Sequence, residues 1–446
     1  MVRDLTKGSV PKHLITFAIP IILGNLFQLT YNAVDSIVVG RYAGTDSLAA
    51  VGTANPVMNI VILGVTGICI GASVLMSQFF GAGDEEKLKR EVSTTLVFGG
   101  IFSLAMVVLG LALSKAILWM MSTPEEILDI AAVYLRIIFL GMPFTYLYNA
   151  MASAMRSVGD SKTPIQFLAA SSVLNIFLDF LFVAVFHWEA VGAGIATVLS
   201  QAMSALLCVW YVYRRVPLLQ LRPGELKMDR ELLKLTLQHG SITALQQSCQ
   251  PIGKLLIQGK INTLGVSAMA AFNAVNRVDD FAFTPEQSIS HAMMTFIAQN
   301  RGAKQMDRVK KGFRDGLLVE FGYWVLICAV ILLFRRPIMG LFSSGESGGM
   351  LELGVEYLGL MAFFYLLPAF TNGIQGFFRG MGNMKITLIS TIIQISVRVV
   401  FVYLLVPAVG MTGVAYASLI GWICMLAAEV PYYFAYMKKQ EQSAQR

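Results

Sequence analysis

Charged residues are scarce in this chain of 446 residues. Aspartate, glutamate, lysine and arginine together make up 14% of it, against 56% hydrophobic residues, and the mean hydropathy is +0.65. This composition lies outside the range of soluble globular proteins and predicts an integral membrane protein. We attribute the net charge of +7 to basic loops beside the membrane and expect no nucleic-acid partner.

Cysteine and histidine are also scarce, and neither is clustered. The five cysteines stand singly inside predicted helices, without disulfide or metal-ligand spacing, so we expect them to be packing residues. None of the four histidines has metal spacing, and no water-soluble domain is predicted that would house an enzyme site. The sequence therefore predicts a protein that is not an enzyme and that needs neither a metal nor an organic cofactor.

What the chain has in abundance is apolar segments long enough to cross a hydrocarbon core of about 30 Å. We predict an all-α membrane protein with twelve spans, six in each half. They lie near residues 14–39, 52–79, 93–113, 131–155, 164–186, 191–213, 240–262, 268–298, 313–334, 353–378, 386–407 and 411–436. The first run is too long for a cleaved signal sequence and lacks a small-residue cleavage site, so we expect it to be a span.

The two halves of the chain repeat each other. Ser47–Asn55 resembles Ala268–Asn276. Further matches pair Gln78, Gly81, Asn149 and Arg156 with Gln299, Gly302, Asn372 and Arg379. Because each half has an even number of spans, the halves are predicted to be parallel repeats with a cavity between them, which is the usual architecture of a secondary transporter.

The longest connection between spans is Arg214–Gly240, and we place the lobe boundary there, giving an N-lobe of residues 1–220 and a C-lobe of residues 221–446. Pro217 and Pro223 interrupt regular structure in this linker. A short amphipathic helix with Asp229 as its cap is expected to follow.

The basic residues are distributed unevenly between the loops. If the N-terminus is cytoplasmic, most of the 34 lysine and arginine residues fall on the cytoplasmic side. The opposite side then holds only Arg41, Lys115, Arg335 and Arg336. Since basic residues near helix ends stay in the cytoplasm, we predict that both termini are cytoplasmic.

An acidic residue lies deep in the first span. A carboxylate at the centre of a span costs about 2.5 to 3.5 kcal/mol on insertion scales, so Asp35 needs an explanation. Gln28, Tyr31 and Asn32 lie on the same side of the helix. We interpret Asp35 as part of a site for a proton or a cation. The alternative is a carboxylate at a helix end that reaches water or an arginine.

A second polar group lies in the fifth and sixth spans. Asn175 and Asp179 are one helical turn apart and share a face, and Thr197 offers another oxygen. An amide oxygen and a carboxylate at this spacing suit a hard cation or a shared proton. The alternative is a structural polar cluster that holds helices together.

The halves differ in these features. Asp35 falls on Leu256 in the repeat, and Pro20, which removes a backbone hydrogen bond and favours a kink, falls on Ser241. We therefore place the acidic site in the first half only.

The second half has acidic residues of its own in the eighth span. Asp279, Asp280 and Glu286 are interpreted either as facing the cavity, where they would attract a cationic substrate, or as engaged locally with Arg277. Arg398, in the eleventh span, is interpreted as the structural partner of an acid such as Glu429 or Glu320. The two interpretations of the acidic stretch stay open.

Several short motifs, taken in order, point to one known family. They are DSIVVG at the end of the proline-containing first span (35–40), LAAVG (48–52), QFFGAG (78–83), the Asn175 and Asp179 pair, and GAGIAT (192–197). Each motif is weak alone, but their order and spacing in a chain of twelve spans are specific. Over its whole length the chain resembles the bacterial branch of the multidrug and toxic compound extrusion (MATE) transporters.

This resemblance implies a fold, a location and an activity. The fold would be two six-helix lobes that form a V around a central cavity, as a monomer among the lipids of a bacterial inner membrane. The activity would be antiport, in which amphipathic and usually cationic organic compounds leave in exchange for inward H⁺ or Na⁺. We favour H⁺, because two carboxylates facing one dry site cannot easily both ionise.

The resemblance also assigns roles to residues. Asp35, Asn175, Asp179 and Thr197 would form the cation site, and Pro20 would be the hinge of the first helix. The side chains expected to line the substrate cavity are Gln28, Tyr31, Asn32, Asn149, Gln247 and Glu286. Where some members carry an acid in the seventh span, this chain has Gln246 or Gln247, so coupling through the second half is not expected.

Other classes of protein fit less well. A major-facilitator transporter would carry a more basic loop after the second span than GAGDEEKLKRE (81–91). A flippase for lipid-linked sugars is the main alternative, although the spans hold few basic residues to bind a pyrophosphate. A channel or a membrane-embedded enzyme would need a filter-like loop or a nucleophile with its base, and the sequence indicates neither.

Overall fold

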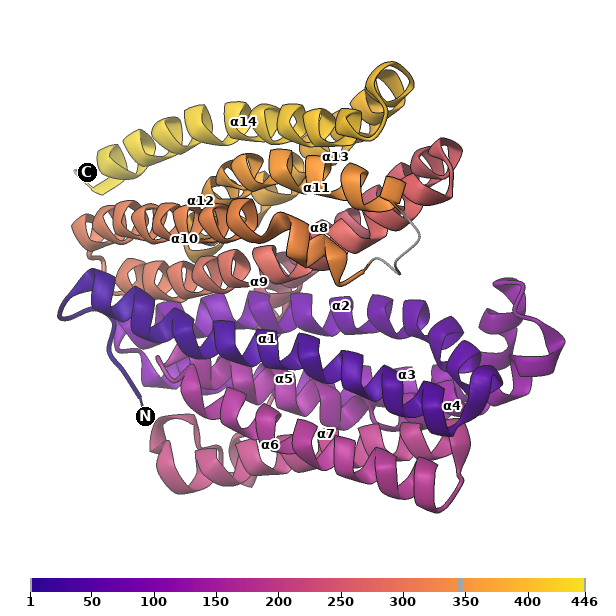
Figure 1. The fold of residues 1–446 in the computed structure, drawn as a ribbon. Helices are drawn as coiled ribbons and strands as arrows, with labels where there is room; N and C mark the ends of the chain where they lie inside the picture. Colours follow the sequence, from indigo (N-terminus) through magenta and orange to yellow (C-terminus); the bar gives the residue numbers. More distant parts are fainter. Residues whose placement is uncertain (1, 343–347, 445–446) are drawn as a thin grey trace. The chain divides into compact units, whose positions relative to one another are not determined.

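The protein is helical throughout the part of the chain that the structure describes. The computed structural model describes residues 2–342 and 348–444, without the side chains of residues 31–36, 39, 223, 348 and 443–444. The α-helices, labelled in Figure 1, are α1 (Val10–Tyr42), α2 (Gly44–Ala82), α3 (Glu85–Met120), α4 (Glu125–Leu140), α5 (Met142–Ser157), α6 (Lys162–Asp179), α7 (Glu189–Arg215), α8 (Arg230–Ile261), α9 (Val266–Gly302), α10 (Met306–Gly340), α11 (Gly348–Phe364), α12 (Leu366–Gly380), α13 (Met384–Val409) and α14 (Thr412–Ala444). The predicted all-α class is confirmed.

These helices supply the twelve predicted membrane-length segments. Among the described residues, eight helices are long and apolar enough to cross a membrane, and two bent pairs, α4 with α5 and α11 with α12, count as one span each. The other two segments, α8 and α9, have 32 and 37 residues, which is long enough at about 1.5 Å per residue. They are more polar than the rest, so they need protein and not lipid around their polar faces.

The predicted spans 131–155 and 353–378 are each broken by a bend of 43°. The first breaks at Gly141, and Pro143 stands at the start of α5. The second breaks before Leu366, and Pro368 lies in the first turn of α12. Proline cannot donate a backbone hydrogen bond to the preceding turn, so the helical ladder is interrupted at the same place in both halves.

The linker between the halves differs from its prediction. Two 3₁₀ turns, Pro217–Leu219 and Pro223–Glu225, precede α8, and α8 then runs without interruption from Arg230 to Ile261. The separate short helix that we predicted is therefore wrong. Gly240 lies inside α8, and its backbone packs closely on α2: a Cβ at Gly240 would lie 2.6 Å from the Cα of Ile68.

The predicted cap at the start of α8 is confirmed. Asp229 accepts hydrogen bonds from the backbone N–H groups of Glu231 at 2.9 Å and Leu232 at 3.2 Å, and Arg90 of α3 pairs with its carboxylate. The bond from Leu232 first, and then that from Glu231, holds the pKa of Asp229 below its ordinary value. The N-terminus of α8 is thus fixed both by its own cap and by α3.

Packing divides the chain into two compact units. The first is built mainly from Ile19–Ala244 with Ala298–Gln305, and the second mainly from Leu245–Ile297 and Met306–Arg446. Each unit has its own apolar core. In the first unit, every residue of α2 from Gly67 to Ser77 is buried, and the small residues of this stretch let neighbouring helices approach closely. The predicted lobe boundary at residues 220 and 221 stays a prediction.

Candidate functional site

The first unit carries a buried polar pair on α6. Asn175 and Asp179 are 1% and 0% exposed and lie one turn apart on the same face of the helix. The α-helix ends at Asp179 and continues as a π-helix, Phe180–Val185. π-Helical segments are rare in proteins, and those that do occur often lie at functional sites. The backbone is therefore wound differently directly after the carboxylate, and no residue pattern in the sequence predicts this change.

Thr197 lies on α7, which packs beside α6. Its side chain is half-buried, and its hydroxyl donates to the carbonyl of Ala193 at 3.0 Å. The lone pairs of the hydroxyl oxygen stay available to a cation or to a proton donor. The first unit thus holds an amide, a carboxylate and a hydroxyl on two adjacent helices.

Asp35, the remaining member of the predicted cation site, lies outside the described side chains, as do Tyr31 and Asn32 of the predicted substrate cavity. The backbone of all three belongs to α1. Pro20 is half-buried, and α1 continues through it as one helix, while Gln28 is exposed. The cation site around Asp35 and the hinge at Pro20 therefore stay predictions.

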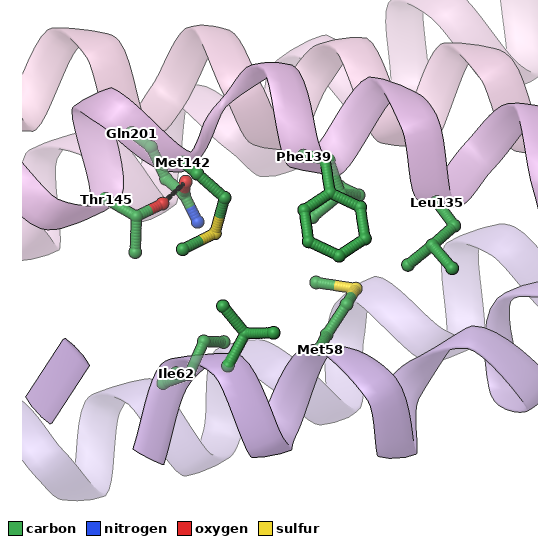
Figure 2. Close-up of a pocket in the computed structure, with 9 residues that line it drawn as sticks. Met58, Ile62, Leu135, Phe139, Met142, Thr145 and Gln201 are labelled. Atoms are coloured by element: carbon green, nitrogen blue, oxygen red, sulfur yellow. Dashed lines mark hydrogen bonds between the residues drawn. The ribbon is translucent and has the colours of Figure 1, made fainter. Parts of the chain in front are cut away.

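A narrow apolar crevice lies in the first unit at the bend between α4 and α5 (Figure 2). Its walls come from α2, α4, α5 and α7, and its free volume is about 10 Å³, which is room for one water molecule and not for an organic compound. At one end, the hydroxyl of Thr145 donates to the side-chain oxygen of Gln201 (Figure 2). Asn149, one turn further along α5, donates to the carbonyl of Thr145 at 2.8 Å. Asn149 therefore lies directly next to this crevice.

In the second unit, Gln246 and not Gln247 joins a buried polar network. The amide of Gln246 donates to Gln375 at 2.8 Å and to Thr391 at 3.1 Å, and Arg379 donates to Gln246 at 3.0 Å. The network ties α8, α12 and α13 together. Gln247 is half-buried, and its place in a substrate cavity stays a prediction.

The acidic residues of α9 have partners on other helices. Asp280 pairs with Lys254 of α8 at 3.3 Å. Asp279 is buried and accepts a hydrogen bond from the hydroxyl of Tyr365, the residue at the break between α11 and α12. These contacts join α9 to α8 and to the break between α11 and α12, and an engagement of Asp279 or Asp280 with Arg277 stays a prediction.

Comparison with known proteins agrees with this architecture. The MatE family profile matches the chain twice, at residues 20–181 and 243–404. The probable multidrug resistance protein YoeA of Bacillus subtilis is 32% identical over 85% of this chain and 83% of its own length. The probable multidrug resistance protein NorM of Thermotoga maritima is 27% identical over 95% of this chain and 91% of its own length. The chain belongs to the MatE family, and its predicted internal repeat is confirmed.

Solved structures have the same fold. A multidrug resistance MATE family transporter of the MOP superfamily, in an outward-facing conformation, has a TM-score of 0.90 at 25% identity and covers 99% of this chain and 98% of that chain. A MATE protein in complex with MaL6 has a TM-score of 0.91 at 24% identity and covers 99% of both chains. The protein is therefore a multi-pass membrane protein of the bacterial MATE type, with the twelve-helix fold that the sequence predicts.

Proposed function

We propose that the protein is a secondary antiporter that exports organic compounds across a bacterial cell membrane in exchange for an inward ion. The observation that carries this proposal is the buried pair of Asn175 and Asp179 at the junction of an α-helix and a π-helix. A carboxylate at such a depth is rare and is stable only when an ion, a proton or a partner neutralises it. Relatives named multidrug resistance and multidrug export proteins support export as the direction.

The exchange follows from competition between two ligands. An ion that enters from outside neutralises Asp35 and Asp179 and favours one arrangement of α1, whereas a substrate that binds from inside favours the other. Each ligand shifts the equilibrium only by its difference in affinity for the two states. Similar MATE proteins were captured in a bent and in a straight conformation, which supports such a two-state element, and we assign the hinge to Pro20.

We further propose that the substrates are amphipathic cations and that the coupling ion is H⁺. Burial and like charge each favour the neutral form of one of two neighbouring carboxyl groups, so the proton would belong to the pair. Na⁺ is the alternative ion, because the oxygens of Asn175 and Thr197 would complete a cage for it.

A flippase for lipid-linked sugars is less well supported. Such a protein would need free cationic side chains to bind a pyrophosphate. In the second unit, Lys254 is paired with Asp280, and Arg379 donates to Gln246 and Gln375, so both cations are already engaged.

The proposal is tested with inside-out vesicles that contain the protein and an imposed pH gradient. We expect them to accumulate the fluorescent cation ethidium, and Asp179→Asn, which keeps the size but not the charge, to abolish accumulation at equal protein levels. Asp129→Asn is the matched control, because that carboxylate is exposed and pairs with Lys115. Accumulation by Asp179→Asn at the wild-type rate would remove Asp179 from the mechanism.

A further inference from the structure

The second unit contains a separate pair of buried acids. Glu286 follows Pro285 on α9, Glu320 lies on α10, and both side chains are 0% exposed. The amide of Asn372, on α12, donates to Glu286 Oε2 at 3.3 Å. A Cβ on the next residue, Gly373, would lie 3.7 Å from Cγ of Glu320. The two acids therefore meet on the same segment of α12, at the seam between α9, α10 and α12.

Among the described residues, neither acid forms an ion pair. Both carboxylate oxygens of Glu320 and one of Glu286 have no hydrogen-bond partner among the described residues. The charges that act on them are negative: Glu286 acts on Glu320, and Asp279 acts on Glu286. The cations Lys254 and Arg398 act on Asp279 further along the seam.

Several other titratable groups near this seam have partners of their own. On α10, Tyr323 donates its hydroxyl to a backbone carbonyl of α9 at 2.9 Å. Tyr365 donates to Asp279. The charged residue of α12, Arg379, donates to the glutamines of the network with α8. His291, further along α9, is half-buried.

We propose that Glu286 and Glu320 form a proton-binding site within the second unit. Two carboxylates of like charge, enclosed without a cation, cannot both stay ionised, so the pair must hold a proton or a bound cation. A hard metal cation is held by about six oxygen ligands. In this pair, the oxygens without a hydrogen-bond partner belong to the two carboxylates. Asn372 offers them an N–H donor and not an oxygen ligand; this donor repels a cation and stabilises an ionised Glu286.

The site is particular to the second half of the chain. Asn372 is the repeat partner of Asn149, so both halves carry an amide at this position. In the register that aligns Gly81 with Gly302, Glu286 and Glu320 fall on Val65 and Gly99, neither of which can ionise. From the sequence, ion coupling was expected in the first half only. The buried acids of the second half argue against that restriction. This inference depends on the packing of the second unit alone and not on the proposed antiport.

The test is an infrared titration of the purified full-length protein in lipid vesicles, which reports protonated carboxyl groups whether or not the protein transports anything. We expect a carbonyl band of a buried carboxylic acid that disappears as pH rises. In Glu286→Gln and in Glu320→Gln the band of the remaining acid should disappear at a lower pH, because the like charge is gone while burial remains; the double variant should lack the band. Glu429→Gln is the matched control: it changes another fully buried acid, which accepts from Ser390 at 2.6 Å, and should leave the band intact.

The proposal would be overturned by a band that the double variant retains, by a titration that neither single variant changes, or by a band that Na⁺ removes at constant pH. If either glutamine variant fails to fold, Asn372→Leu keeps both acids and still tests the site. Without the amide donor, ionised Glu286 is less stable, so the band should persist to a pH about one to two units higher. An unchanged titration in Asn372→Leu would contradict the assignment.

Discussion

Acids buried among the helices are the residues that set this protein apart from an ordinary helical bundle. One of them, Asp179, could be identified from the sequence, because it interrupts an otherwise apolar run. The burial of Glu91 could not be predicted in this way, since Glu91 stands at the end of the charged loop sequence GAGDEEKLKRE (81–91). In the structure it is 0% exposed and accepts a hydrogen bond from Thr236 of α8 at 2.6 Å. Which side of a helix a neighbour covers is decided by packing, so sequence patterns cannot predict this burial.

At the same scale, the cap of α8 gives a stability prediction. Asp229→Ala should lower the free energy of unfolding by about 1 kcal/mol, because two backbone N–H groups lose their acceptor. The measurement is thermal unfolding in detergent. Glu231→Ala, which removes a carboxylate from the same turn but leaves the cap, is the control, and an equal loss in both variants would contradict the capping role.

The pH dependence of this effect has a definite sign. The folded-state pKa of Asp229 is lowered, so its contribution is fully present above the unfolded value of about 3.9. It is lost as pH falls through the lower folded-state value. The difference between Asp229→Ala and the wild type should therefore be constant near neutral pH and shrink in strong acid.

At the scale of helices, the repeated Gln-x-x-Gly motif has a structural meaning. The ends of α2 and α9 cross within the first unit. A Cβ at Gly81 would lie 1.9 Å from the carbonyl oxygen of Gln299, and a Cβ at Gly302 would lie 1.9 Å from that of Gln78. The sequence shows that these residues repeat, but it does not show that the two copies contact each other.

The crossing predicts that both glycines are irreplaceable. Gly302→Ala and Gly81→Ala should each destabilise the protein by at least about 1 to 3 kcal/mol, because the backbones must separate. Gly100→Ala in α3 is the control. A Cβ there would meet no atom within 4 Å, so it should be neutral or stabilising by up to about 1 kcal/mol. Equal thermal midpoints for Gly302→Ala and Gly100→Ala would contradict this crossing.

The first helix carries a prediction about motion. If the kink at Pro20 is the moving part, Pro20→Ala restores a backbone hydrogen bond and biases one state without touching the ion ligands. Substrate binding at equilibrium should survive in this variant while turnover falls. Binding is measured by fluorescence titration and turnover by transport into vesicles; normal turnover would mean that the proline only relieves packing.

The helix predictions were right where hydropathy alone determines the segment. They were incomplete where contacts with neighbouring helices determine a bend or a helix boundary. The twelve segments follow from hydropathy, whereas the bends at Gly141 and before Leu366 do not, because apolar residues continue through both breaks. The short linker helix was predicted to be separate from the span that begins near residue 240, but the two form one helix, α8, in which the backbone of Gly240 packs closely on α2.

For the whole molecule, two homologous halves have acquired different polar interiors. The first unit carries Asn175 and Asp179, and the second carries Glu286 and Glu320 around Asn372. A symmetric fold with asymmetric charges suits a transporter in which one half or both halves bind the driving ion. The sequence identified the first set by its position in apolar runs, whereas the convergence of the second set depends on how three helices pack.

The central claim is that an inward ion drives export through the acids of the first half. The most direct test is transport in liposomes that contain no Na⁺, with the flux of protons and of an organic cation recorded together. We predict an inward proton flux that accompanies substrate export, is lost in Asp35→Asn and survives in Leu256→Ala at the repeat-related position. If no transport occurs until Na⁺ is restored, or if Asp35→Asn still couples the two fluxes, the account is wrong.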